Sequence, residues 1–331
     1  MKNNLKVEIY KPLEFIFALC AMYVVVDPDC HYTDYDFIEV PPVKYFDDIK
    51  DLFSGIDVLK YREWMNKHLI EQGDFPKLGI ALDDEMNLKY VPNFDSEIPE
   101  EELYKFCGEL KELYNKVNWN KFYNEHKDQY DEFINEFSAF PEDLDMDEFI
   151  KLYGIEPNSF VYNPSVLMNG GFGISDDSSN FYYLRGFIYN KEEKKYRCYI
   201  PAIVECLFHE FSHPIVNGLV DKHFDKLEDP FRLYDYSVEN KLHPGYSGDV
   251  RTVYYEYMVR TVAYYLTLTY YPDYDIDMEY NSSFGFGLLD KFVVVLSDAI
   301  ATGNYKNYED IYVNVIIPYI NNLELDKKRA L

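Results

Sequence analysis

Two histidines and a glutamate stand together in the segment HEFSH, residues 209–213. On a helix, residues four apart lie on one face, so His209 and His213 can both reach one Zn²⁺ at roughly 2.0–2.1 Å. Glu210 then projects from the adjoining face, where a carboxylate can take a proton from a metal-bound water. The spacing therefore predicts a zinc site with Glu210 as the general base.

The residues around this segment indicate a buried helix, because Phe208, Phe211 and Ile215 are all apolar. Burying two histidines and a glutamate without partners is costly, which favours a metal site over hydrogen-bonded core histidines, the alternative interpretation. Pro214 directly follows the motif, and a proline inside a helix removes one hydrogen bond and clashes with an earlier carbonyl. We therefore expect either a kink or an adjusted position of Glu210, which affects activity more than metal binding.

A catalytic zinc takes three protein ligands and keeps one position open. The best third ligand is Glu256, because residues 249–270 read as a helix in which Glu256 and Arg260 are the only charged residues after position 251. A lone carboxylate among valines and tyrosines needs a partner. That partner could be the metal, an ion pair with Arg260 one turn away, or both. Three other carboxylates, in less apolar surroundings, are reserve candidates: Glu228, Glu239 and Asp249.

HEFSH followed some forty residues later by a helical glutamate resembles the gluzincins, the thermolysin-like zinc metallopeptidases. The segment HEFSHPIVN also resembles the motif found in a group of uncharacterised bacterial proteins, a metallopeptidase motif. The resemblance covers roughly residues 159–265 and leaves the first 140 unexplained. It implies a zincin-like fold, Zn²⁺ as cofactor, and a peptide or protein substrate. Carried over residue by residue, it implies His209, His213 and Glu256 as ligands and Glu210 as general base.

The chain departs from the gluzincin pattern at Arg260, where an aspartate that supports a histidine often stands. Support for the histidines must then come from elsewhere. Asn217, one turn beyond His213, is a candidate for this role, with Arg260 bracing Glu256. Alternatively, Asn217 caps the end of a helix before Gly218.

Enzymes of this kind bind an extended substrate along an edge strand, through main-chain hydrogen bonds. The natural candidate is the segment before the active helix, where two glycines allow a close approach of backbones. An ordinary hairpin is the alternative interpretation. The candidate substrate-binding residues are Tyr162, Asn169, Gly170 and Gly171.

A hydroxyl or an imidazole must also stabilise the oxyanion. Tyr246 is the candidate, because Gly245 and Gly248 place it in a loop between the two metal-binding helices. Tyr254 and His243 are the alternatives, and with 34 tyrosines in the chain the choice rests on position alone.

The pattern of apolar and polar residues predicts an α+β fold that is mainly helical. Helices are expected at 12–26, 45–72 with a break at 54–55, 97–140 as two helices, 143–153, 199–224, 249–270, 286–301 and 306–323. Strands are expected at 6–10, 82–92, 159–175 and 181–189.

The strands after residue 159 predict a small, mostly antiparallel sheet beside the HExxH helix, and Pro164 suits an edge strand. Residues 1–140 form a helical N-terminal region and residues 141–331 the zincin-like, metal-binding region. The boundary falls near 140–157, and without an obvious linker we expect one integrated unit.

The composition excludes several classes of partner. With 59 acidic and 32 basic residues, the chain has a net charge of −27 and no basic patch, which argues against nucleic acid and anionic membranes. The apolar run 15–26 is too short to span a bilayer and lacks the flanking charge of a signal peptide, so it predicts a core element. Five cysteines without a CxxC pair are typical of free thiols in a reducing compartment, and we expect a cytoplasmic protein.

Three functions remain open from the sequence. The first is a zinc-dependent peptidase or related amide hydrolase. The second is a zinc-binding protein in which Pro214 and Arg260 have abolished the chemistry. The third is a non-enzymatic binding module that uses its many tyrosines for recognition.

Overall fold

The computed structural model describes most of the chain. The described residues are 5–26, 44–68, 74–94, 96–140, 144–165, 167, 171–176, 180–186, 189–190, 195–196, 199–275 and 277–323. The chain divides into two compact units. We call Leu5–Phe140 with Asn158–Ile200 the N-terminal unit, and Pro141–Pro157 with Pro201–Leu331 the C-terminal unit. One division falls after Phe140, and the strands after residue 158 belong with the N-terminal helices and not with the HExxH segment.

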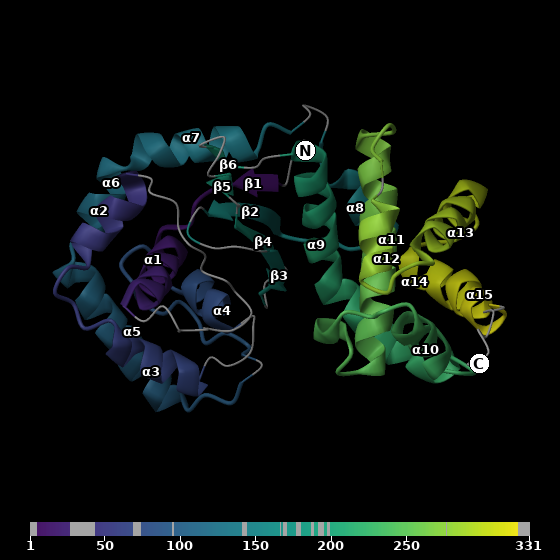
Figure 1. The fold of residues 1–331 in the computed structure, drawn as a ribbon, viewed down its shortest axis with the longest axis horizontal. Helices are drawn as coiled ribbons and strands as arrows, with labels where there is room; N and C mark the ends of the chain where they lie inside the picture. The colour runs from purple at the N-terminus through teal and green to yellow at the C-terminus, as the bar shows by residue number, and fades with distance from the viewer. Residues whose placement is uncertain are drawn as a thin grey trace. The chain divides into compact units, whose positions relative to one another are not determined.

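The N-terminal unit is built around its first helix. Its helices are α1 (Lys11–Val26), α2 (Lys44–Leu52), α3 (Leu59–His68), α4 (Asp74–Ala81), α5 (Glu100–Lys116), α6 (Trp119–Glu125) and α7 (Lys127–Phe137), labelled in Figure 1. Nearly every side chain described from Leu13 to Tyr23 is buried, which explains why this helix is apolar all round. Phe15 contacts Tyr114 and Trp119 edge-on, so α1 packs against α5 and α6. The prediction of a core element is confirmed from Phe15 to Tyr23, whereas Val25 and Val26 at the end of the run are exposed.

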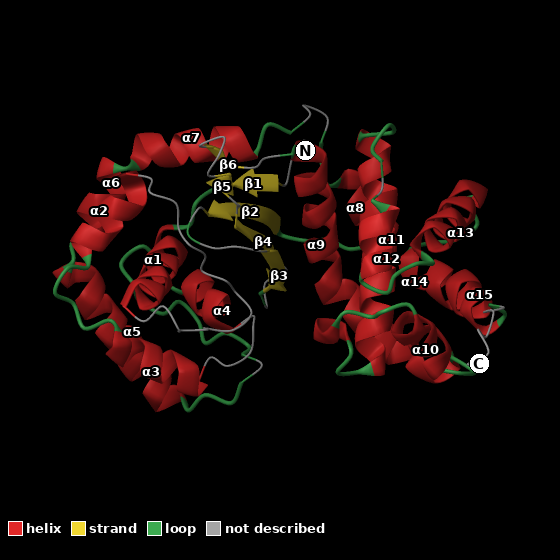
Figure 2. Cartoon of the chain, in the orientation of Figure 1, coloured by secondary structure: helices red, strands yellow, loops and turns green. Residues whose placement is uncertain are grey.

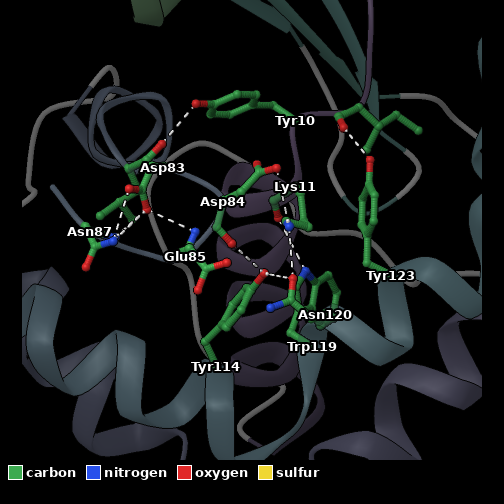
Figure 3. Close-up of polar contacts among 12 residues, drawn as sticks. Tyr10, Lys11, Asp83, Asp84, Glu85, Asn87, Tyr114, Trp119, Asn120 and Tyr123 are labelled. Atoms are coloured by element: carbon green, nitrogen blue, oxygen red, sulfur yellow. Dashed lines mark hydrogen bonds and ion pairs between the residues drawn. The ribbon is translucent and has the colours of Figure 1, made fainter. Parts of the chain in front are cut away.

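Polar contacts fix the beginning of α1 (Figure 3). Tyr123 donates its hydroxyl to the carbonyl oxygen of Ile9 at 2.7 Å, and the indole of Trp119 donates to that of Lys11 at 3.3 Å. The ammonium of Lys11 donates to Asn120 at 2.9 Å. Because all three partners belong to α6, these hydrogen bonds join the beginning of α1 to that helix.

Glu14 brings a carboxyl group into this core. Glu14 is 1 % exposed, and it accepts hydrogen bonds from the hydroxyls of Tyr45 at 2.7 Å and Ser165 at 3.1 Å. Burial raises the pKa of Glu14 to about 7, although the two hydroxyls lower it.

The main sheet is mixed. Its strands are β1 (Leu5–Val7), β2 (Ser159–Ser165), β3 (Gly171–Ser175) and β4 (Asn180–Gly186), in the spatial order β1-β2-β4-β3 (Figure 2). β2 runs parallel to β1 and β4, and only β3 and β4 are antiparallel. The prediction of a mostly antiparallel sheet is wrong, because β4 lies between β2 and β3 instead of beyond β3. Two short strands, β5 (Tyr189–Asn190) and β6 (Lys195–Tyr196), pair separately.

Pro164 lies on an inner strand, not on the expected edge strand. β4 pairs with β2 along its whole length, whereas β1 reaches only as far as Tyr162. The missing N–H of Pro164 therefore falls beyond the end of β1, where a proline removes no bond of the described β1–β2 ladder.

The C-terminal unit is helical in its described residues. It contains α8 (Asp147–Tyr153), α9 (Ile200–His223), η1 (Phe224–Lys226), α10 (Phe231–Glu239), η2 (Pro244–Tyr246), α11 (Val250–Tyr270), α12 (Met278–Ser283), α13 (Leu289–Thr302), α14 (Tyr308–Ile311), the π-helical turn η3 (Tyr312–Ile316) and α15 (Ile317–Asn321). Figure 1 shows α9 and α11 side by side, and the rings of Phe208 and Tyr270 stack at 5.9 Å between them. α9 stays helical across Pro214.

Several elements differ from the prediction. Residues 82–92 form only an isolated bridge between Leu82 and Leu88, so the expected strand is absent. The region 97–140 forms three helices instead of two, because Asn118 adopts a left-handed conformation, with φ of 56°, between α5 and α6. Three short helices, α4, α10 and α12, were not predicted. Among the described residues, no helix combines the length and the apolar character that crossing a membrane requires.

Candidate metal centre

The imidazoles of His209 and His213 face each other across one turn of α9, and their Nε2 atoms lie 3.1 Å apart. Four buried apolar residues anchor this part of the helix: Val204, Leu207, Phe208 and Phe211. Burial, together with the nearby charges of His213 and Arg260, holds the pKa of His209 well below its ordinary value. The ring of His209 is therefore neutral near pH 7, which is the form that binds metals.

Glu256 joins the two histidines from α11. One oxygen of its carboxylate, Oε1, lies 3.5 Å from Nε2 of His213, and the other, Oε2, lies 3.9 Å from Nε2 of His209. Ligands bound to one zinc at 2.0–2.1 Å in a tetrahedron stand about 3.4 Å apart. The three side chains form a group that could hold a metal ion, and their donor set fits Zn²⁺.

Asn217 lies beside His213, the arrangement that one of the two interpretations requires. Its Oδ1 atom lies 3.3 Å from Nδ1 of His213. An acceptor at this position holds the proton on Nδ1 and leaves the lone pair of Nε2 directed at Glu256 and His209. The capping alternative is wrong, because α9 continues past Gly218 to His223.

Arg260 pairs with Glu256 one turn along α11. Its Nε atom donates to Oε2 at 3.1 Å, and its Nη2 atom lies 3.0 Å from the same oxygen in the ion pair. Burial alone would lower the pKa of Arg260, but the carboxylate of Glu256 and nearby tyrosines raise it, so the guanidinium stays charged. Because Oε1 faces His213 and Oε2 accepts from Arg260, the ion pair leaves one carboxylate oxygen facing His213.

Tyr246 reaches this group through Arg260. Its hydroxyl accepts a hydrogen bond from Nη2 of Arg260 at 3.3 Å. Burial and the charge of Glu256 raise the pKa of Tyr246 to about 12, so it is a neutral phenol that can donate a proton in a hydrogen bond. Of the alternatives, Tyr254 donates to the carbonyl of Pro230 instead, and His243 is exposed in the same loop as Tyr246.

The candidate base and the reserve ligands take different positions. Glu210 follows His209 on α9 and is partly exposed. The reserve ligands lie outside the three-residue group: Glu228 and Glu239 are exposed, and Asp249 caps the start of α11 by accepting from the amide of Arg251.

The candidate substrate-binding residues belong to the N-terminal unit, whereas the histidines belong to the C-terminal unit. Tyr162 is buried on the inner strand β2, where it stacks on Tyr183 at 5.3 Å, so the expected edge strand is wrong for this residue. Gly171 lies on β3, which is the last strand in the sheet order. Asn169 and Gly170 lie outside the described residues.

Two further residues near this group, Asn281 and Glu205, were not predicted from the sequence. Asn281 is buried on α12 and accepts from Nη1 of Arg260 at 3.1 Å. Glu205 stands one turn before His209 on α9 and accepts from Tyr274 at 2.5 Å. Helical spacing from His209 could have identified Glu205. No pattern in the sequence predicts that Asn281 contacts Arg260, because the two residues are distant in the chain and Asn281 lies on a short helix that was not predicted.

Comparisons with known proteins add no assignment to this geometry. The chain matches no protein-family model, and no curated protein or solved structure matches it significantly.

Proposed function

We propose that this protein is a zinc-dependent metallopeptidase or a related amide hydrolase of the gluzincin type. The observation that supports this proposal best is the convergence of His209, His213 and Glu256, two of which belong to an HExxH segment. A purely structural zinc site has no use for the glutamate at the second position of that segment, whereas a hydrolase requires it.

In this proposal, His209, His213 and Glu256 hold the ion. Zinc bound there supplies a Lewis acid that polarises the scissile carbonyl and makes a water molecule more acidic. The carboxylate of Glu210 accepts the proton that the attacking water loses and then delivers it to the leaving nitrogen. The carboxylate thus returns to its starting state, and the amide bond is exchanged for a carboxylic acid and an amine.

Tyr246 is the proposed donor to the developing oxyanion. Its hydroxyl already accepts from Arg260 at 3.3 Å, and this charge-assisted bond makes the phenol proton a stronger donor. Arg260 in turn holds Glu256, so the ligand and the oxyanion donor share one guanidinium.

Cleavage of a peptide library tests the proposal. The wild-type protein, loaded with zinc, is incubated with the library, and new peptide ends are identified by mass spectrometry. We expect cleavage that stops with a chelator, returns with added zinc, and is lost in Glu210→Gln, which keeps its size but cannot accept the proton. Cleavage by Glu210→Gln at the wild-type rate would contradict the assigned base.

A zinc-binding protein without hydrolase activity is the second candidate. It is favoured by the positive charge of Arg260 against Glu256 and by Pro214 directly after the motif. Stoichiometric zinc without cleavage of any library peptide would support it. If the protein binds no zinc at all, the tyrosine-rich, non-enzymatic binding module is the remaining interpretation.

A further inference from the structure

The buried amide of Asn281 connects α12 to the candidate metal centre. Its Oδ1 atom accepts from Nη1 of Arg260 at 3.1 Å, and its Nδ2 atom donates to the hydroxyl of Tyr264 at 2.6 Å and to the carbonyl of Asp277 at 2.8 Å. Arg260 can only donate and the Asp277 carbonyl can only accept, so the amide has one possible orientation. The side chain of Asn281 is 0 % exposed, and water cannot replace these contacts.

Arg260 is consequently held from several directions. Nη1 of Arg260 donates a hydrogen bond to Asn281, and Nη2 donates one to the hydroxyl of Tyr246. On the side of Glu256, Nε donates to Oε2 and Nη2 lies 3.0 Å from that same oxygen. A guanidinium without such anchors commonly binds a carboxylate as a fork, with one donor on each oxygen. A fork here would occupy Oε1, which is the oxygen that faces His213 at 3.5 Å.

We propose that Asn281 is a positioning residue of the metal centre. By anchoring Nη1, it restricts Arg260 to Oε2 of Glu256 and keeps the other oxygen, Oε1, directed at His213. This inference rests on the proposed function to the extent that it requires a metal at His209, His213 and Glu256. It assigns a role to a residue on a separate helix, which touches none of the three ligands in any described contact.

Zinc affinity in three variants tests the role, measured on folded protein by competition with a chromophoric chelator. Asn281→Leu keeps the approximate shape but removes the acceptor for Arg260. Asn281→Asp keeps an acceptor for Nη1 of Arg260 but loses the donor to Tyr264 and to the carbonyl of Asp277, so it separates the contact with Arg260 from the other contacts of the amide. Asn163→Leu is the matched control, because Asn163 is also buried, at 1 % exposure, and accepts from a backbone amide in the N-terminal unit.

We expect Asn281→Leu to weaken zinc binding about 10- to 100-fold, the range typical of lost support for a ligand. Asn281→Asp should bind within about threefold of wild type, and Asn163→Leu should lower the thermal midpoint without changing zinc affinity. If Asn281→Leu does not fold, Tyr264→Phe removes only the hydroxyl that holds Nδ2, and a severalfold loss of affinity is expected.

The outcomes separate the two proposals. A wild-type protein that binds no zinc overturns both. If wild type binds zinc and Asn281→Leu binds it with an affinity within twofold of wild type, only the positioning role is overturned. The same result in the substitute variant Tyr264→Phe has the same meaning. Equal losses in Asn281→Leu and Asn281→Asp also overturn it, because a general loss of packing would then explain the effect.

Discussion

The Nε2 atoms of His209 and His213 lie 3.1 Å apart on successive turns of α9. Oδ1 of Asn217 lies 3.3 Å from Nδ1 of His213, and in the tautomer that donates from Nδ1 to this oxygen, Nε2 presents a lone pair to His209. Two such nitrogens can share a proton or bind one cation. Their common neighbour is the carboxylate of Glu256, whose negative charge favours the cation.

The first prediction concerns metal content. We expect the purified protein to hold close to one zinc per chain and His213→Ala to hold little, because two ligands bind zinc far more weakly than three. Elemental analysis after dialysis measures both. His223→Ala is the control, since His223 lies on the same helix but pairs with Glu309 at 2.7 Å. Equal zinc in wild type and His213→Ala would exclude the site.

The second prediction separates the two partners of Glu256. Glu256→Gln should weaken zinc binding strongly, because a neutral amide is a poor ligand for a dication. Arg260→Met should weaken it only about 10- to 100-fold, since Arg260 acts through the carboxylate. Zinc affinity of the folded fraction is measured together with the thermal midpoint in chelator.

A different result is expected if Glu256 and Arg260 form only a buried ion pair. Removing either partner would then strand the other charge and cost about 3–5 kcal/mol of stability. Equal destabilisation of both variants with unchanged zinc affinity would remove Glu256 as a ligand. Asp131→Asn is a suitable control, because it breaks the exposed pair of Asp131 with Lys127, for which little effect is expected.

The third prediction tests the tautomer of His213. Asn217→Leu removes the acceptor at Nδ1 and should weaken zinc binding about tenfold or more. Asn217→Asp keeps an acceptor there and should retain most of the affinity. If both variants bind zinc as wild type does, the 3.3 Å contact has no role in metal binding.

The fourth prediction concerns Glu14 and the stability of the N-terminal unit. The pKa of Glu14 is raised from 4.5 to about 7 in the folded chain, so the folded state binds the proton more tightly than the unfolded state. The contribution of Glu14 to the free energy of unfolding is therefore fully present below pH 4.5 and is lost as the pH rises through 7. The loss amounts to about 3 kcal/mol by pH 8.

Glu14→Gln should remove this part of the pH dependence, because the amide stays neutral. Urea unfolding at pH 5 and pH 8, followed by tryptophan fluorescence, measures it. Both tryptophans, Trp64 and Trp119, belong to the N-terminal unit, so the signal reports that unit alone. Glu8→Gln, at an exposed position, gives the background. The same loss of stability in wild type and Glu14→Gln would show that Glu14 is not responsible.

The local features of the candidate metal centre could be predicted from the sequence. His209 and His213 share a helix face because helical spacing is a local property, and α9 forms as predicted. Glu256 stood out as a lone carboxylate in an apolar helix, because a buried charge requires a partner wherever it lies. The apolar run at 15–26 was recognised as core for a similar reason.

The tertiary structure decided which distant groups meet. β4 lies between β2 and β3, which chain order does not specify, and this placement makes the sheet mixed. Arg260 could have satisfied Glu256 alone, but Asn281 and Tyr246 approach it from other segments and restrict it to one oxygen. These contacts depend on how α11, α12 and the loop before α11 pack together. Spacing along one helix predicts which residues share a face, but only the packing of helices determines which atoms face them.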